Sequence, residues 1–182
     1  MLSGKIIEKF KAKDGSEVII RFLKFEDWED CLKLINSLVE EDAPILANRK
    51  FSKKEEIEWV CEKLKKIENR EAIVIVAEVN KRVVGICEVE KKHFRESHIG
   101  KFGIGIIKEF RGLGIGERLM RKALELSKKQ LKLKMVTLDV FEINKVAMNL
   151  YKKLGFKVYG KLPKAFYYKG KYIGSISMYK EL

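Results

Sequence analysis

The sequence contains little cysteine, histidine and proline, and these shortages narrow the class of protein. Its 182 residues include 3 cysteines, 2 histidines and 2 prolines. Cys31, Cys61 and Cys87 are odd in number and share no close spacing, so they predict neither a disulfide framework nor a zinc site. His93 and His98 have no neighbouring cysteine to complete a tetrahedral metal shell. We therefore expect no metal, and reduced cysteines as in a cytoplasmic protein.

Long apolar runs are also missing. No stretch approaches the roughly 18 apolar residues that cross a bilayer. The first residues, MLSGKIIEKFKAKDG, lack the apolar core of a secretory signal. The sequence therefore predicts no membrane partner and a cytoplasmic location.

Acidic side chains are scarce in the second part of the chain. Residues 1–100 carry 20 basic and 20 acidic side chains, out of 39 and 26 in the whole chain. Residues 101–182 carry the remaining 19 and 6, so the formal charge of +13 lies wholly there. A charge confined in this way favours an anionic partner: nucleic acid, a phosphorylated cofactor or an acidic membrane surface.

Apolar spacing predicts a mixed order of strands and helices. Apolar residues three or four positions apart predict helices, and short runs rich in β-branched residues predict strands. The expected strands are 17–22, 72–77, 83–87, 103–107, 135–141, 156–159 and 172–179. The expected helices are 27–40, 52–67, 115–131 and 145–154. The order is strand, two helices, three strands, helix, strand, helix, and two strands.

Local signals mark several ends of these elements. Ser52 and Glu55 fit a capping box at the start of the second helix. The pair Asn80-Lys81 fits a tight hairpin turn, and Gly155 fits a left-handed helix end. No linker or repeat divides residues 17–180. The sequence therefore predicts one domain over residues 1–182, with its core at about 17–180, of mixed α/β class and not a regular doubly wound sheet.

A strand, a glycine-rich turn and a helix follow one another around residue 112. Glycine stands at alternate positions where the helix begins, at Gly112, Gly114 and Gly116. Glycine lets the backbone approach a ligand closely, and the first turn of a helix presents unpaired N–H groups with a partial positive charge. Arg111 and Arg118 would add direct charge. The arrangement is typical of a phosphate-binding site.

Two common phosphate-binding patterns fit this loop poorly. The dinucleotide fingerprint requires glycine or alanine where Glu117 or Leu119 stands. Asp139, at the end of the next strand, occupies a place where a ribose-binding acid could lie, but the upstream hairpin interrupts the regular βαβ order. The Walker pattern is absent because no Gly-Lys-Ser/Thr follows the loop.

Two segments resemble the GNAT N-acetyltransferase superfamily. Residues 111–116, RGLGIG, resemble its pyrophosphate-binding motif, Gln/Arg-x-x-Gly-x-Gly/Ala. Residues 144–156 are similar to its Asn-x-x-Ala-x-x-x-Tyr-x-x-x-Gly-Phe segment, with each spacing intact. The resemblance covers about residues 17–180 in element order and is strong over 102–158. It implies a mixed, mainly antiparallel sheet flanked by helices, with a splayed strand pair forming a cleft for acetyl-CoA.

The resemblance also implies how the coenzyme is held. In the family, a bulge splays the strand before the loop from its neighbour, and unpaired backbone groups there bind the pantetheine arm and the acetyl carbonyl. By position, the N–H of Ile104 or Ile106 would be the oxyanion donor. The implied cofactor-binding residues are Ile104, Ile106, Arg111, Gly112, Leu113, Gly114, Ile115, Gly116, Glu117 and Asn144. Asn144 equally fits a plain helix N-cap.

Catalytic roles come from the same resemblance. It implies that Tyr151 is the general acid that protonates the coenzyme thiolate; a core aromatic is the alternative interpretation. For the general base, Asp139 matches a position that is acidic in some ribosomal-protein acetyltransferases of the superfamily. Glu88 lies on a strand beside the expected cleft and could act through water. Glu90 and His98 are weaker alternatives.

The predicted activity is transfer of an acetyl group from acetyl-CoA to a primary amine by direct attack in a ternary complex. The acceptor would be a small molecule or a protein N-terminus, bound near residues 40–51, where Glu40-Glu41-Asp42 suits a cation but also fits an exposed polar turn. The alternative is a basic nucleic-acid-binding or ribosome-associated module, for which Tyr167-Tyr168 is only a weak stacking platform. A homodimer is also possible.

Overall fold

The computed structural model describes residues 2–182, and its elements follow the apolar spacing of the sequence. The strands are β1 (Ile6–Lys11), β2 (Glu17–Phe22), β3 (Ala72–Val79), β4 (Arg82–Lys91), β5 (Ile99–Ile106), β6 (Met135–Phe141), β7 (Lys157–Tyr168) and β8 (Lys171–Glu181). The helices are α1 (Trp28–Glu40), α2 (Lys53–Glu68), α3 (Ile115–Gln130) and α4 (Lys145–Lys153). Single 3-10 turns occur at Phe25–Asp27, Phe94–Glu96 and Lys108–Phe110.

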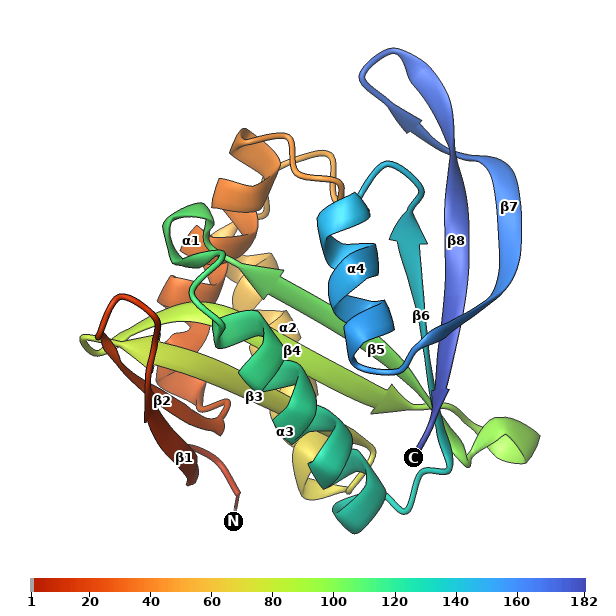
Figure 1. The fold of residues 1–182 in the computed structure, drawn as a ribbon. Helices are drawn as coiled ribbons and strands as arrows, with labels where there is room; N and C mark the ends of the chain where they lie inside the picture. Colours follow the sequence, from red (N-terminus) through yellow and green to blue (C-terminus); the bar gives the residue numbers. More distant parts are fainter. Residues whose placement is uncertain (1) are drawn as a thin grey trace.

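All eight strands join one mixed sheet in the order β1-β2-β3-β4-β5-β6-β8-β7. Every neighbouring pair is antiparallel except β5 and β6, which run parallel because α3 crosses between them. The helices α1 and α2 lie behind the sheet in Figure 1, and α3 and α4 lie in front of it. The prediction of a mixed, mainly antiparallel sheet flanked by helices is therefore confirmed.

The centre of the sheet is the most deeply buried part of the core. Helices cover both faces of β3, and Val74, Ile75 and Val76 have no exposed surface. On one side, Leu34 and Leu38 of α1 pack against the sheet, and on the other side Leu119 of α3 does so. Burial on both faces explains why residues 72–77 form a continuous apolar run and not an alternating one.

The predicted ends of the elements are confirmed at three places. The Ser52 hydroxyl accepts a hydrogen bond from the Glu55 amide, and the Glu55 carboxylate accepts one from the Ser52 amide, which forms the capping box. Asn80 and Lys81 have φ angles of 50° and 64°, as the expected hairpin turn requires. Gly155 has a φ of 86° at the end of α4.

Four strands differ from the sequence-based expectation, and one of them is β4, which continues to Lys91 and does not end at residue 87. β1, which pairs with β2 along its length, has no counterpart among the expected elements. It is an edge strand with mostly half-exposed or exposed residues, so its apolar pattern is weak. β5 begins at Ile99 and not at residue 103, and β7 continues to Tyr168 through two irregularities in its pairing with β8. The edge position of β7 tolerates Pro163 within the strand.

A buried ion pair fixes the start of α1. Arg21 of β2 donates hydrogen bonds from both terminal nitrogens to the two carboxylate oxygens of Asp27, each at 2.7 Å. Its Nε donates to Glu78 of β3 at 2.8 Å. The bidentate geometry satisfies a guanidinium that is almost fully buried, and it orients the helix that forms one wall of the cavity described below.

Candidate functional site

A cavity of about 920 Å³ lies where β5 and β6 diverge. α1, residues 44–51 and α2 line it behind the sheet, β4, β5 and β6 line its middle, and α4 lines it in front. The cavity therefore passes through the sheet. It brings together five of the predicted site residues: Glu88, Ile104, Asp139, Asn144 and Tyr151.

The gap between β5 and β6 opens part of the way along both strands. Their parallel ladder joins Ile99 with Met135 and ends where Lys101 pairs with Thr137. Beyond this point β5 pairs only with β4, and β6 pairs only with β8. The predicted splayed strand pair is present.

The expected bulge is not the cause of this divergence. The β4–β5 ladder keeps one register from Gly85–Ile106 to Lys91–Gly100, without a shift. β6 is likewise paired with β8 over its whole length. Each strand thus follows the twist of its own antiparallel partner, and the two twisted pairs separate without an inserted residue.

Backbone groups of β5 point into the gap. The Ile107 amide donates to the Val84 carbonyl at 2.9 Å, and the Lys92 amide donates to the Ile99 carbonyl at 2.9 Å. Residues in an antiparallel ladder alternate between facing the partner and facing away. The N–H and C=O groups of Ile104 and Ile106 therefore face away from β4, towards the gap.

The glycine loop leads from β5 into α3 with its backbone uncovered. Gly112 and Gly114 have φ angles of 76° and 87°, and a Cβ atom at either position would meet nothing within 4 Å. Gly114 is the N-cap of α3, and no side chain caps this end. The first amides of α3 thus keep free hydrogens at the positive end of the helix.

The two arginines of the loop region lie in different places. Arg111 donates from Nε to the Ile106 carbonyl at 2.9 Å, and its terminal nitrogens pair with Glu41 just after α1. Arg118 instead pairs with Glu8 of β1 at 2.7 Å. The structure brings Arg111 to the gap but does not bring Arg118 there.

Acidic residues of the first part of the chain offset the positive second part. Besides the pairs of Arg111 and Arg118, Lys169 lies 3.4 Å from Asp42. Within the second part itself, Glu117, in the first turn of α3, pairs with Lys153 at 2.6 Å and with Arg121 at 2.8 Å. Part of the excess positive charge is therefore neutralised by ion pairs within the fold and does not attract a ligand.

Tyr151 lies at the front of the cavity, on α4. Its ring packs edge-on against Phe102 and beside Phe156, and it is 8% exposed. Burial raises its pKa to about 12, so the phenol keeps its proton at neutral pH. Asn144 begins the same helix, and its side-chain oxygen accepts a hydrogen bond from the Ala147 amide at 3.1 Å. The N-cap interpretation of Asn144 is confirmed.

Asp139 and Glu88 line the cavity, and a lysine binds each of them. Burial alone would raise the pKa of Asp139, but hydrogen bonds from Lys101 and Ser177 outweigh it and hold the pKa below its usual value. Glu88 lies 2.9 Å from Lys63 of α2. Lys101 and Ser177 thus stabilise the charged form of Asp139, which weakens it as a proton acceptor.

Sequence reasoning missed Glu56. This residue of α2 is 6% exposed and lines the cavity behind the sheet. Burial raises its pKa to about 7, and no other cause contributes. Glu56, Val60, Lys63 and Ile67 share the buried face of α2 at helical spacing. That periodicity is the signal that could have identified it.

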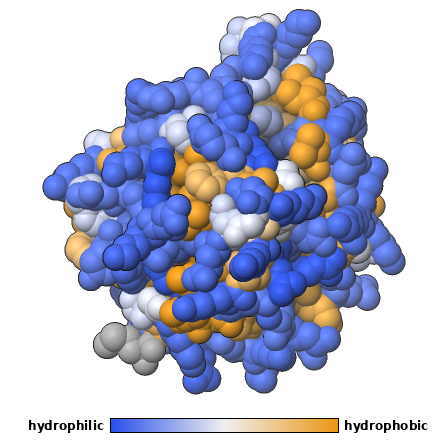
Figure 2. All heavy atoms as spheres, turned by 60° about the vertical axis from the view of Figure 1, so that its left-hand side comes forward, coloured by the Kyte–Doolittle hydropathy of each residue, from blue (hydrophilic) through white to orange (hydrophobic). Residues whose placement is uncertain are grey.

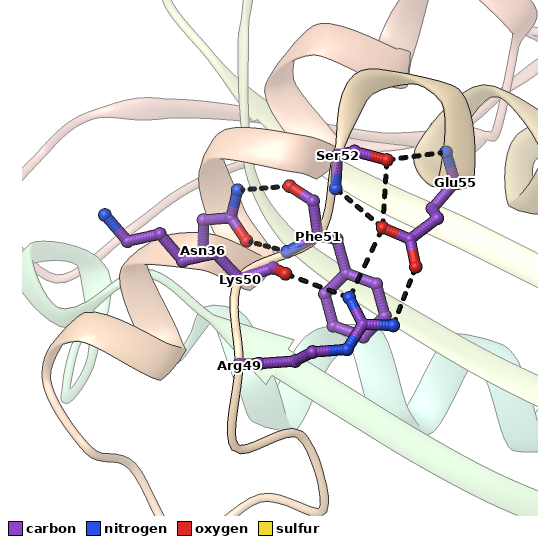
Figure 3. A network of polar contacts seen from close by, with 6 residues as sticks. All are labelled: Asn36, Arg49, Lys50, Phe51, Ser52 and Glu55. Atoms are coloured by element: carbon purple, nitrogen blue, oxygen red, sulfur yellow. Dashed lines mark hydrogen bonds and ion pairs between the residues drawn. The ribbon is translucent and has the colours of Figure 1, made fainter.

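A network of polar contacts holds the segment between α1 and α2 against the cavity (Figure 3). The side-chain amide of Asn36 donates to the Phe51 carbonyl at 3.0 Å and accepts from the Phe51 amide at 2.8 Å. Arg49 pairs with Glu55 at 2.7 Å, next to the capping box. The network positions the Phe51 ring in the cavity wall and fixes the turn of α2 that carries Glu56.

The face of the molecule shown in Figure 2 is largely hydrophilic. Hydrophilic residues cover most of the face in Figure 2, and apolar residues appear mainly in the hollows between them. Within residues 2–182, no helix has the length and apolarity needed to cross a membrane. The same residues contain no group of three or more metal-ligating side chains placed to hold an ion.

Comparison with known proteins gives a family match over most of the chain. A model described as "Acetyltransferase (GNAT) family" matches residues 28–156. The L-amino acid N-acetyltransferase AaaT of Escherichia coli is 30% identical over 105 residues, which cover 57% of this chain and 65% of AaaT. An N-alpha-acetyltransferase of Sulfurisphaera tokodaii is 28% identical over 162 residues, which cover 83% of this chain and 87% of that protein. The chain thus aligns with slightly under two thirds of AaaT.

Solved structures share the fold. YncA from Salmonella typhimurium, determined with its cofactor acetyl-CoA, superposes with a TM-score of 0.81 at 18% identity. The superposition covers 91% of this chain and 94% of YncA. At an identity of 18%, the similarity between the two proteins is one of fold, including the order of the strands in the sheet and of the helices.

Proposed function

The chain belongs to the GNAT acetyltransferase family, and we propose that it transfers the acetyl group of acetyl-CoA to a primary amine of a small molecule or a protein N-terminus. One observation carries the proposal. The gap between β5 and β6 exposes backbone hydrogen-bonding groups, and it opens into the same cavity that holds the Tyr151 hydroxyl. The proposed binding surface for the thioester and the proposed proton donor therefore line one cavity.

The coenzyme side of the site comprises the β5–β6 gap and residues 111–117. We propose that the free amides from Gly112 to Glu117 bind the pyrophosphate, because unpaired N–H groups at a helix start attract phosphate. Ile104 and Ile106 would hold the pantetheine arm and the acetyl carbonyl through their backbone. Arg111 and the side-chain NH₂ of Asn144 complete this set. Acetyl-CoA supplies the activated acetyl group as a thioester.

Tyr151 is the proposed general acid. Its raised pKa of about 12 keeps the proton available, and its ring lines the cavity beside Phe102 of β5, which supports the proposal. As the carbon–sulfur bond breaks, the phenol would donate its proton to the leaving sulfur. Removing that donor leaves a thiolate to depart unaided, which slows the chemical step.

Asp139 and Glu88 are proposed as cavity carboxylates that assist the acceptor amine. Both line the cavity and form ion pairs, Asp139 with Lys101 and Glu88 with Lys63, and the lowered pKa of Asp139 opposes a role as proton acceptor for that residue. The assignments can be separated by measuring pH–rate profiles of Asp139→Asn and Glu88→Gln. If the pH–rate profile of a variant keeps every limb of the wild-type profile, the substituted residue is not the general base.

Calorimetric titration tests the proposed function directly. We expect micromolar binding of acetyl-CoA and no comparable binding of a generic oligonucleotide at moderate salt. A screen that follows thiol release would then show turnover with primary amines. Absence of coenzyme binding would overturn the proposal, and oligonucleotide binding alone would favour the nucleic-acid alternative.

A further inference from the structure

Glu56 is the only carboxylate of the cavity wall that no other described group engages. Its side chain is more than nine-tenths buried, and it faces the cavity without a hydrogen bond or an ion pair from any of residues 2–182. A buried carboxylate without a partner is costly, so folded proteins rarely keep one without a use. A ligand that brings a positive charge would remove that cost.

Each of the other carboxylates of the wall already has a positively charged side chain as its ion-pair partner. Glu55 binds Arg49 and closes the capping box, and Glu88 binds Lys63. Asp139 binds Lys101 and Ser177. The available negative charge of the cavity is therefore concentrated on Glu56.

The surroundings of Glu56 are apolar. Leu34 of α1, Ile45 and Phe51 of the connecting segment, Trp59 of α2 and Phe166 of β7 contribute to the same wall. Among residues 2–182, Lys101 is the one lysine that lines the cavity, and Asp139 neutralises it. An acceptor with a free carboxylate would thus bury that charge without a partner, whereas an apolar group would meet matching walls.

We propose that Glu56 binds the ammonium group of the acceptor and takes its proton, and that the acceptor is a primary amine carried by an apolar group with no free carboxylate beside it. The inference rests on the proposed acetyltransferase function. It specifies which class of acceptor binds at the rear wall of the cavity. This wall is formed by α1, residues 44–51 and α2, and we call it the acceptor side.

The proton balance of the step is complete with Glu56, Tyr151 and solvent. The ammonium gives one proton to Glu56 and becomes a neutral amine, whose lone pair attacks the thioester carbon. The carbon–nitrogen bond forms and the carbon–sulfur bond breaks. The nitrogen loses its second proton, Tyr151 gives a proton to the sulfur and regains one from the nitrogen, and Glu56 releases its proton to solvent.

The charged groups around Glu56 leave it free for this role. Cys31 of α1 faces it, but burial raises the pKa of that thiol far above neutrality, so the thiol stays uncharged. On the adjoining elements, Asp27 and Arg21 neutralise each other, and Lys63, on the same face of α2, is taken by Glu88 and Glu90. A pKa of about 7 suits a group that accepts a proton at neutral pH.

The charge-removing variant Glu56→Gln is the central test. We expect kcat/KM for the amine to fall by at least about 100-fold, with acetyl-CoA affinity unchanged by calorimetry. The limb near pH 7 in the pH–rate profile of the wild-type enzyme should be absent from the profile of Glu56→Gln. Glu56→Asp should restore part of the rate. Glu58→Gln, which removes an exposed charge from the same helix, is the matched control and should retain wild-type activity. Retention of the limb and of the rate in Glu56→Gln would overturn the proposal.

Thermal unfolding provides a readout that does not depend on activity. Because the folded-state pKa of Glu56 lies above its usual value, the folded protein binds more protons than the unfolded chain between about pH 4.5 and 7. Glu56 therefore lowers stability as the pH rises through this window. The gain in Tm of Glu56→Gln over wild type should be larger at pH 8 than at pH 5. An equal gain at both values would show that the carboxylate has another partner, which contradicts the proposal.

A set of acceptors with one aromatic group tests the substrate class. We expect 2-phenylethylamine and L-phenylalaninamide to exceed L-phenylalanine by about 10-fold or more in kcat/KM, because only the last buries an unpaired carboxylate. A higher value for a peptide that begins with Phe than for 2-phenylethylamine would identify protein N-termini as the source of the amine, and the reverse would identify small amines. Phenylalanine or spermidine as the best acceptor would overturn the inference. Failure of acetyl-CoA to bind would instead refute the proposed function.

Discussion

The coenzyme side and the acceptor side of the cavity are built from different parts of the chain. On the coenzyme side, the polar groups belong to the backbone: the free amides after Gly112 and the gap-facing groups of Ile104 and Ile106. On the acceptor side, the surface consists of side chains from separate elements, with Glu56 among apolar neighbours. A backbone site can serve one invariant ligand, whereas a side-chain site can change its substrate by single replacements.

Tyr151→Phe should have the largest effect, because it removes a group at the junction of the two sides. We expect kcat to fall by about 100-fold or more, while calorimetry shows little change in acetyl-CoA affinity. The ring contacts with Phe102 and Phe156 remain in this variant, so the fold is kept. Unchanged turnover would remove Tyr151 from the catalytic assignment.

Gly114→Ala tests whether the coenzyme side depends on backbone shape. Gly114 has a φ of 87°, which costs a residue with a side chain about 1–2 kcal/mol, or roughly 5- to 30-fold in Kd if coenzyme binding must restore it. Gly170→Ala is the control, because Gly170 has a φ of 75° in the β7–β8 turn and, like Gly114, has open space where a Cβ atom would lie. Calorimetry should show weaker acetyl-CoA binding only for Gly114→Ala. Equal losses would mean that strain acts on overall stability alone.

Ser52→Ala tests how the acceptor side is held in place. The change removes the helix cap shown in Figure 3, and we expect the free energy of unfolding in urea to fall by about 1 kcal/mol. KM for the amine should rise modestly because Phe51 is next to the cap, whereas acetyl-CoA affinity should stay the same. A change in coenzyme affinity would contradict the separation of the two sides.

Arg111→Gln should have the smallest effect of the four. Arg111 is partly exposed and already pairs with Glu41, so its contribution to coenzyme binding is expected to be a few-fold at most. That contribution should shrink as salt is added. Arg118→Gln, whose side chain pairs with Glu8, is the comparison and should leave acetyl-CoA affinity unchanged. Equal effects of both variants would indicate general attraction by the positive surface.

The two sides also differ in how far the sequence predicts them. The glycine spacing at 112–116 and the segment 144–156 identify the coenzyme side because backbone sites depend on which residues lack side chains. Glu56 is hard to identify because it stands in a charged run, KKEEIE, where only the phase of the helix separates it from the half-buried Glu55. The pairing of Arg111 with Glu41 joins residues 70 positions apart, and no local pattern encodes it.

The fold, like the site, is only partly predictable from the sequence. The core strands and all four helices follow from apolar periodicity, because burial dictates the pattern. β1 lies at the sheet edge with half-exposed residues, so its sequence alternates too weakly to be identified. The separation of β5 from β6 depends on which neighbour each strand follows, and this is a property of the assembled sheet.

The short ladder between β5 and β6 has a consequence for hydrogen exchange. The sheet consists of two parts, β1–β5 and β6–β8. Only the three residue pairs of the β5–β6 ladder, which we call the seam, join them by strand pairing among the described residues. The amides of Ile104 and Ile106, beyond the seam, lack a strand partner and should exchange with deuterium quickly, while those of Gly103 and Gly105, which face β4, should exchange slowly. The exchange rates of alternate amides in β5 can thus be compared within one strand. A ligand that fills the gap would slow the exchange of only the Ile104 and Ile106 amides.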